Sequence, residues 1–395
     1  MDKRAFIFLF NVFFFLLDSI FNFNLDIPVY AASLILLFLA FLIPGFFSLE
    51  KYSIYKIICF LFSVSFIVSL FTVGFNKDSL SDYLFIMSFF GATFLYSSKQ
   101  DLIKHHHLYI NIFFGVCLIL FLPTFFGFDK NSWGDTISVA SDDIEYNRSY
   151  RQGIFRIAHV AGYFFSYLLL YYSNTVWKSK DFSLKNMLIL LGITTVILLT
   201  GSRTPIAIII LSLLLFFFRL KYIKVLIPFL AFLIVMLLNV EVLLLYSKDT
   251  VVYQYVSLLK TMTVNFPRLS RVIIWKSWWS EIQSFGFVDF LFGRGLHASK
   301  LANLKNVGSS IWFHNDFLSI VYSYGVLPLI AYTLLFFKIY TTHKVYIKDN
   351  IFIFCAFSGL WLSAFLNGFY YYYPLITLYL FFAMVQSERK EVFND

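Results

Sequence analysis

Apolar stretches long enough to cross a lipid bilayer recur along the whole 395-residue chain. A membrane-spanning helix needs about 20 mostly apolar residues, with a range of roughly 17–25. Hydrophobic residues make up 60% of the chain, and a soluble fold could not bury that many. The pattern therefore predicts an all-α, polytopic membrane protein with about twelve transmembrane helices. The predicted spans are residues 5–23, 28–48, 54–75, 80–97, 107–126, 156–177, 186–200, 204–219, 222–247, 313–340, 350–368 and 371–386.

Basic residues outside the spans indicate the orientation, because cytoplasmic loops carry an excess of Lys and Arg. With Lys3 and Arg4 in the cytoplasm, every second loop is short and basic, whereas the turns at 24–27 and 367–372 contain neither residue type. The other basic residues of the cytoplasmic segments are Lys51, Lys56, Lys99, Lys104, Lys178, Lys180, Lys185, Arg219, Lys221, Lys224, Lys338, Lys344, Lys348, Arg389 and Lys390. We therefore predict a single integral membrane domain, 1–395, with both termini in the cytoplasm.

Two long outer segments, 127–155 and 248–312, break this charge pattern. Long loops are translocated largely regardless of charge, so they do not oppose the topology. Residues 248–312 are predicted to form a long periplasmic or extracellular loop between the ninth and tenth spans. The first span lacks a small-residue cleavage site, so we expect it to be retained and not removed as a signal peptide.

The charge and the cysteine content argue against several functional classes. The net charge of +9 consists mostly of orientation signals, so it gives no reason to expect a nucleic-acid partner. Cys59, Cys117 and Cys355 all lie within spans, which argues against a disulfide framework or a cysteine metal site. Asp142, Asp143 and Glu145 have the oxygen ligands that a divalent ion prefers, but an acidic run of this kind is more often a solvated loop. We predict no metal site and no cofactor.

The first polar block on the predicted outer side is Gly201-Ser202-Arg203-Thr204, which lies between two spans. Pro205 suits the first turn of a helix, where an N–H is not needed, and Ser202 can cap that helix. Arg203 is then expected at the positive end of a helix, where the dipole and the guanidinium both favour a phosphate. An arginine that only marks the membrane interface fits the same position.

Residues 267–285 are predicted to form an amphipathic helix on the outer leaflet, with Trp at the headgroup level. Its apolar side comprises Leu269, Val272, Ile273, Trp275 and Trp279. Arg268 and Arg271 lie about one helical turn apart, so both can face one anion. Anchoring of the helix in the headgroup layer, without a binding function, is the alternative.

Two further blocks follow. Gly293-Arg294-Gly295 allows a tight turn with exposed backbone N–H groups, although an ordinary loop turn fits as well. His314-Asn315-Asp316 opens the tenth span. A histidine can be neutral near pH 7 and accept a proton, so His314 is the candidate general base. Asn315 or Asp316 is assigned to capping the helix.

His159 and Arg151 are secondary candidates for substrate contact. His159 enters the sixth span from the outer side, and Arg151 precedes it in the same outer segment. A hydrogen-bonded histidine within the helix bundle is an equally good interpretation of His159.

The order and spacing of these blocks resemble those of the O-antigen ligase and polymerase superfamily. The blocks are Leu199-Thr200-Gly201-Ser202-Arg203-Thr204, Arg271 with Trp275, Phe290-Leu291-Phe292-Gly293-Arg294-Gly295, and His314-Asn315. Nine residues, Asp316 to Tyr324, separate His314-Asn315 from Gly325, which is the spacing typical of that family. The motifs cover about 199–330, and the N-terminal half is similar only in its many spans. Pro328 departs from the family pattern, which often has a second glycine there.

The resemblance implies a GT-C-like fold and an inverting, metal-independent glycosyltransferase in a bacterial cytoplasmic (inner) membrane. The donor would be an oligosaccharide on undecaprenyl diphosphate. Arg203 and Arg271, with Arg268 and Arg294, would hold the diphosphate, and His314 would activate the acceptor hydroxyl. Cations stabilise a departing diphosphate and a neutral histidine takes up a proton, so the chemistry of the residues agrees. Secondary substrate contacts are assigned to Asn315, His159 and Arg151. Implied partners are the lipid bilayer and a chain-length regulator and flippase of the same pathway.

Within the superfamily, the Wzy-type polymerase of O-antigen (lipopolysaccharide) or capsule is favoured, because the block 290–295 resembles polymerases more than ligases. The alternative is the O-antigen ligase, which transfers the glycan to lipid A core and has the same His-Asn-x9-Gly pattern. A transporter of lipid-linked sugar is a third candidate, from another class. It is disfavoured because the polar groups lie in outer loops and not in paired, interrupted helices near the midplane.

Overall fold

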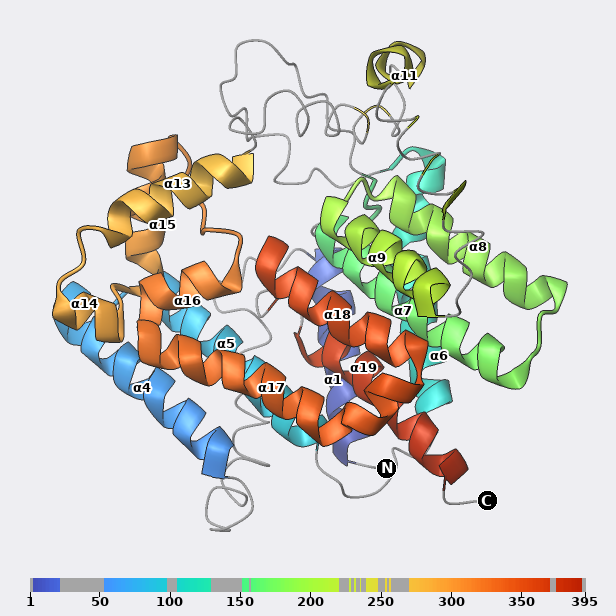
Figure 1. Ribbon diagram of the computed structural model, residues 1–395, viewed down its shortest axis with the longest axis horizontal. Coiled ribbons are helices and arrows are strands. Elements are labelled where there is room, and N and C mark those ends of the chain that lie inside the picture. The colour runs from blue at the N-terminus through green and yellow to red at the C-terminus, as the bar shows by residue number, and fades with distance from the viewer. Residues whose placement is uncertain are drawn as a thin grey trace. The chain divides into compact units, whose positions relative to one another are not determined.

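The computed structural model describes residues 3–21, 53–97, 105–128, 151–155, 158–219, 239–247, 270–369 and 374–392, together with positions 227, 228, 231, 235, 253 and 256. Across these ranges the regular structure is helical, and they contain no strand (Figure 1). The all-α prediction is confirmed for this part of the chain.

The helices are given in chain order. Those before residue 220 are α1 (Lys3–Phe21), α4 (Ser53–Val73), α5 (Lys77–Ser97), α6 (His106–Phe121), the 3-10 helix η2 (Leu122–Phe126), α7 (Ala158–Ser179), α8 (Leu184–Leu199) and α9 (Arg203–Arg219). Those after it are α11 (Val240–Ser247), α13 (Ser270–Ile282), α14 (Phe287–Phe292), α15 (Gly295–Val307), α16 (Asp316–Tyr324), α17 (Val326–Asp349), α18 (Ile351–Leu366) and α19 (Pro374–Val392).

Most of the predicted spans coincide with helices, whereas the predicted span 28–48 and half of 222–247 lie outside the described residues. Within the described residues, the helices at Tyr55–Thr72, His106–Phe126 and Val326–Asp349 are long and apolar enough to cross a membrane. Shorter apolar stretches occur in α1, α8, α9, α18 and α19. The structure therefore supports a helical membrane protein, and the count of about twelve spans stays a prediction.

The predicted tenth span, 313–340, is not one helix. α16 ends at Tyr324 and α17 begins at Val326, so that Gly325 interrupts them with φ 89° and ψ −178°. This backbone region is essentially restricted to glycine, because a Cβ would collide with the chain. The prediction was wrong here because the apolar pattern continues through the break.

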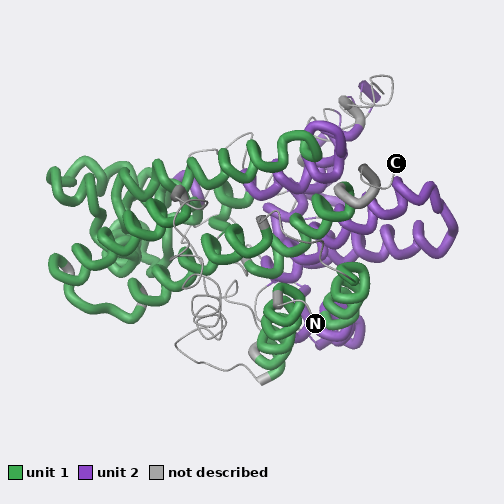
Figure 2. Tube along the Cα trace, turned by 90° about the horizontal axis from the view of Figure 1, so that it is seen from below, with its two compact units in different colours: residues 1–116, 274–347, 363–395 green, residues 117–273, 348–362 purple. Residues whose placement is uncertain are grey.

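The described residues form two compact units, shown in different colours in Figure 2. Unit 1 consists of residues 1–116, 274–347 and 363–395, and unit 2 of residues 117–273 and 348–362. Helix α13 begins in unit 2 and continues in unit 1.

The core of unit 1 is built largely from aromatic rings. Phe8 of α1 stacks on Tyr379 of α19 with ring centroids 3.8 Å apart. Phe89 of α5 contacts both Tyr332 of α17 and Phe369, at centroid distances of 5.5 and 5.4 Å. All of these aromatic side chains are at most 2% exposed. Such pairs contribute about 0.5–1.5 kcal/mol beyond burial, and here they fix α17 and the segment after α18 against α5.

In unit 2, α7 packs against both α8 and α9. Gly162 allows α7 to approach α9 closely, since a Cβ at this position would lie 2.7 Å from Cγ of Pro205. Ser166, one turn further along α7, donates hydrogen bonds to the carbonyls of Gly162 and Pro205 at 2.8 and 3.4 Å. The starts of α7 and α9 are therefore held together.

Candidate functional site

The first predicted block forms the turn between α8 and α9 in unit 2. Gly201 has φ 65°, and the Thr200 hydroxyl closes the end of α8 by donating to the carbonyl of Ile197 at 2.7 Å. The same hydroxyl oxygen accepts from the backbone N–H of Ser202 at 3.3 Å. α9 then begins at Arg203. The sequence thus places Arg203 at the positive end of a helix, as predicted, and its side chain is half-buried.

Arg271 lies at the same helix end. Its Nη2 donates to Oγ1 of Thr204 at 3.2 Å, and the Thr204 side chain is 1% exposed. The residues come from positions 67 apart in the sequence. Arg271 of α13 therefore contacts the residue that follows Arg203, and both arginines lie at the start of α9.

His159, near the start of α7, joins this cluster. Its Nδ1 is 3.0 Å from Oγ of Ser202, which is fully buried. The hydroxyl that the sequence assigns to a helix cap is thus hydrogen-bonded to the histidine. His159 is therefore a hydrogen-bonded histidine of the helix bundle, next to the residue that precedes Arg203. Its contact with substrate stays a prediction. Ser202, Arg203, Thr204, His159 and Arg271 together are named the arginine cluster.

Three other candidates of the outer segments have different outcomes. Arg151 is half-buried and begins a short segment that docks on η2, where Gly153 donates to the Thr124 hydroxyl at 2.8 Å and Ile154 to the carbonyl of Leu120 at 2.8 Å. Arg268 lies outside the described residues, as do Asp142, Asp143 and Glu145.

In unit 1, α13 is anchored by tryptophans. Nε1 of Trp275 donates to the carbonyl of Phe313 at 3.1 Å, and Nε1 of Trp278 donates to the carbonyl of Leu318 at 3.0 Å. Ile274 is 3% exposed and packs with Phe313 in one apolar cluster. Ile274, which is not among the residues of the predicted apolar side, therefore belongs to the side of α13 that packs on the protein.

The tryptophans of α13 differ in their exposure. Trp279, on the apolar side that is predicted to face the outer leaflet, is 60% exposed. A buried indole N–H needs a hydrogen-bond acceptor. Trp275 and Trp278 find theirs in the backbone carbonyls of Phe313 and Leu318.

His314 occupies the left-handed region of the backbone, with φ 51°. This conformation costs a non-glycine residue about 1–2 kcal/mol, although histidine tolerates it better than most residues. Both neighbours are fixed: Phe313 is fully buried, and Asn315 caps α16 by accepting from the N–H of Leu318 at 3.0 Å. Local strain that the surroundings impose is typical of functional sites.

Asn315 and Asp316 have separate roles. Asn315, the N-cap residue, also donates from Nδ2 to the carbonyl of Phe365 at 2.8 Å. Asp316 is 1% exposed and does not cap the helix. Its carboxylate accepts from the N–H of Phe369, at 2.9 and 2.8 Å, and from the hydroxyl of Tyr332. Asp316 thus ties the start of α16 to α17 and to the segment after α18.

The two glycine-containing motifs pack against each other within unit 1. A Cβ at Gly293 would lie 2.3 Å from the backbone of Ser323 and Tyr324, and a Cβ at Gly325 would lie 2.0 Å from the carbonyl oxygen of Leu291. Backbone therefore touches backbone, which explains why both positions hold glycine.

The amides of this turn are not exposed as predicted. Gly293 donates its N–H to the carbonyl of Asp289 at 2.7 Å, and Arg294 donates to the carbonyl of Tyr322 at 2.8 Å. The prediction of a turn with open N–H groups is wrong at these two positions. Gly295 lies beside Ser69 of α4, and Ser69 falls inside the candidate span Tyr55–Thr72. Gly295 is therefore packed beside the last turn of this candidate span.

The Arg294 side chain stabilises this turn. Its Nη2 lies 2.7 Å from Oδ2 of Asp289 and its Nη1 donates to the hydroxyl of Ser284 at 3.1 Å, while the guanidinium carbon lies 4.5 Å from the ring centre of Phe285. Partial burial disfavours the charged carboxylate, but the hydrogen bonds from Arg294 and from the N–H of Gly286 outweigh it and lower the pKa of Asp289.

Several contributing residues were not found from the sequence. Thr204 belongs to the first polar block, but the sequence assigned it no role, and the structure shows that it accepts the hydrogen bond from Arg271. Phe365, whose carbonyl accepts from Asn315, has no motif that marks it. Gly162 lies in an ordinary apolar pattern, and only its packing against Pro205 explains it.

Within the described part of the chain, no group of three or more His, Cys, Asp or Glu side chains could hold a metal ion. No family model matches this chain, and no curated protein sequence matches it. The arginine cluster can bind an anion, and the 313–316 segment presents an imidazole from a fixed backbone.

Proposed function

We propose that the protein is a glycosyltransferase that polymerises a bacterial surface polysaccharide, with a polyprenyl-diphosphate-linked oligosaccharide as donor. The observation that carries this proposal is the hydrogen bond from Arg271 to Thr204, which places Arg271 at the positive end of α9, where Arg203 also lies. Guanidinium groups bind phosphate oxygens in a planar, two-point geometry, and a helix N-terminus favours the same charge. A diphosphate is the anion that such a site suits.

The proposed reaction is an inverting transfer. The acceptor hydroxyl oxygen attacks the anomeric carbon of the donor, and the hydroxyl proton passes to the imidazole of His314. The bond between the anomeric carbon and the diphosphate oxygen breaks at the same time. The lipid diphosphate leaves with the electron pair, and Arg203 and Arg271 stabilise its charge.

The assignment of both sets of residues to one reaction rests on the sequence resemblance, and each set has a structural feature of its own. Helix α13 carries Arg271 and, one turn later, Trp275, whose indole is hydrogen-bonded to the residue before His314. His314 also has the strained backbone that is typical of functional residues. Arg294 enters the proposal as a positioning residue, because its guanidinium is engaged with Asp289 and Ser284.

The orientation and location are part of the same proposal. The chain would lie in the bacterial cytoplasmic membrane with both termini inside and the arginine cluster at the outer face, where the lipid-linked donor is polymerised. Deletion in the native host distinguishes the polymerase from the ligase. Surface glycan reduced to single repeat units indicates a polymerase, whereas long lipid-linked chains with bare core indicate a ligase.

The arginine assignment is tested on purified variants. Arg203→Ala and Arg271→Ala should each weaken binding of a polyprenyl diphosphate about tenfold or more, because a hydrogen bond to a charged group contributes about 1.5–3 kcal/mol. Arg271→Lys should recover only part of this, since a lysine lacks the planar two-point geometry. Lys276→Ala is the matched control, because Lys276 is an exposed cation on the same helix. Equal binding by all variants would reduce the arginines to anchors at the membrane interface.

A further inference from the structure

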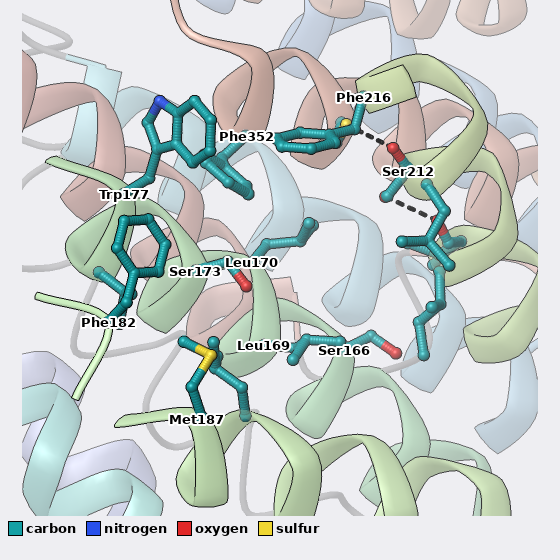
Figure 3. A pocket seen from close by; sticks show the side chains of 16 residues that line it. Ser166, Leu169, Leu170, Ser173, Trp177, Phe182, Met187, Ser212, Phe216 and Phe352 are labelled. Atoms are coloured by element: carbon teal, nitrogen blue, oxygen red, sulfur yellow. Dashed lines mark hydrogen bonds between the residues drawn. The ribbon is translucent and has the colours of Figure 1, made fainter. Parts of the chain in front are cut away.

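A cavity of about 270 Å³ lies within unit 2, between α7, α8, α9 and α18 (Figure 3). On α7 its lining extends from Ser166 to Trp177, and on α9 from Ile208 to Phe216. Both runs end toward the turn that joins α7 to α8. The arginine cluster lies at the other end of the same helices, because α9 starts at Arg203 and α7 starts beside His159.

The cavity offers almost no polar partner to a ligand. Two of its serines use their hydroxyls within their own helices: Ser166 donates to the carbonyl of Gly162 at 2.8 Å and Ser212 to the carbonyl of Ile208 at 2.7 Å. The other walls are mainly Leu, Ile, Val, Phe, Trp and Met side chains. A ligand for this space must therefore be a hydrocarbon, and an apolar space of this size holds a hydrocarbon segment.

Aromatic rings frame the end near the α7–α8 turn. Trp177 lies 5.3 Å from Phe216, 6.4 Å from Phe182 and 6.4 Å from Phe352, measured between ring centroids. Figure 3 shows these four rings on one side of the cavity. Trp177 and Phe182 are 43% and 56% exposed, although both are large apolar residues. Exposed aromatic rings at the end of apolar helices are typical of the membrane interface.

The turn itself is basic. Residues 178–185 contain Lys178, Lys180 and Lys185 against one acid, Asp181. The Asp181 carboxylate stabilises the turn, since it accepts from the N–H of Ser183 at 3.2 Å and from Nδ2 of Asn186 at 2.8 Å. Lys180 and Lys185 are exposed. An apolar cavity with aromatic rings and lysines at one end matches a lipid with an acyl chain and an anionic headgroup.

We propose that this cavity binds one acyl chain of an anionic phospholipid from the leaflet at the lysine-bearing end, with the headgroup held by Lys178, Lys180 and Lys185. The site is distinct from the arginine cluster and does not depend on glycosyl transfer. Phe216 comes 13 positions after Arg203 along α9, which is about 20 Å at the rise of an α-helix. A lipid diphosphate held by Arg203 would have its headgroup at the opposite end.

The test uses the fluorescence of Trp177 in the full-length protein in detergent. Phosphatidylglycerol with brominated acyl chains should quench the fluorescence of Trp177, which is the part of the signal that the Trp177→Phe variant lacks. The quenching should saturate as the lipid concentration rises. Phosphatidylcholine with the same chains should reach half-maximal quenching only at a higher concentration. Each lysine near an anionic headgroup strengthens binding about fivefold, so Lys180→Gln with Lys185→Gln should weaken phosphatidylglycerol binding about 25-fold.

Two controls make the result decisive. Lys344→Gln with Lys348→Gln removes two exposed lysines of α17 and should leave the quenching curve unchanged. Ser173→Phe should fill the cavity and abolish the saturable component. If that variant fails to fold, the lysine variants decide, since they lie on an exposed turn.

Three results would overturn the proposal. The first is equal affinity for the two phospholipids, and the second is an unchanged curve in the Lys180 and Lys185 variant. The third comes from mass spectrometry of lipids that copurify with the protein: a polyprenyl lipid that Ser173→Phe displaces would show that the tail of the donor occupies the cavity.

Discussion

Substituting Gly325 with alanine tests the contact between the two glycine motifs. Gly325 has φ 89° and ψ −178°, a region that costs other residues about 1–3 kcal/mol. The new Cβ would also lie 2.0 Å from the carbonyl oxygen of Leu291, and overpacking of this kind costs about 1–3 kcal/mol. Together these terms predict a loss of about 2–6 kcal/mol, because neither backbone can move without breaking the hydrogen bond from Arg294 to Tyr322.

Two other glycines separate strain from collision. Gly308 has φ 75°, and no neighbouring atom lies within 4 Å of the place that a Cβ would take, so Gly308→Ala should cost only the left-handed backbone term of about 1–2 kcal/mol. Gly192 lies inside α8 with open space around it, so Gly192→Ala should be neutral or stabilise by up to about 1 kcal/mol. In one detergent, the midpoint temperature of thermal unfolding should be highest for Gly192→Ala, lower for Gly308→Ala and much lower for Gly325→Ala. Coincident curves for Gly308→Ala and Gly325→Ala would refute the close contact.

Two further predictions concern carboxylates of unit 1. Asp316→Asn should lower stability by about 1–3 kcal/mol, because an amide NH2 would replace one of the two carboxylate oxygens that accept from the N–H of Phe369, so that two donors would face each other in a buried site. Thermal unfolding measures the loss. The lowered pKa of Asp289 implies stability that is present above the ordinary carboxyl pKa of about 3.9 and is lost as the pH falls through the lower, folded-state pKa. Asp289→Asn should remove this pH-dependent part of the stability and also release the Arg294 side chain. If the variant and the wild-type protein have the same pH profile of unfolding, the assignment of the lowered pKa to Asp289 is contradicted.

The helical fold was predictable because bilayer-crossing length and apolar composition are local properties of the sequence. Helix breaks were not, and Gly325 shows why. The residues on both sides of it are apolar, and only the close approach of residues 291–293, from a separate part of the chain, requires glycine there. Hydropathy measures burial and carries no information on backbone contacts.

The candidate site shows the same division. The position of Arg203 at a helix start followed from Pro205 and from the end of the preceding apolar run. The hydrogen bond of Arg271 to Thr204 spans 67 positions, and no local pattern encodes it. The sequence allows Asn315 or Asp316 to cap the helix, because both residue types often do so. Only the structure shows that Asn315 takes that role and that the Asp316 carboxylate is buried against Phe369.

In the proposed reaction, His314 takes the proton from the acceptor hydroxyl while the arginine cluster holds the donor. The most direct test compares elongation of a lipid-diphosphate repeat unit by purified wild-type and His314→Ala protein, with EDTA present, beside equilibrium binding of the donor. A missing general base should slow transfer by about 10²–10⁴-fold, while donor binding stays within a few-fold of wild type. His297→Ala, which changes a histidine of α15, should elongate at the wild-type rate. Elongation by His314→Ala at the unmutated rate, or complete dependence of the wild-type protein on added divalent metal, would contradict this mechanism.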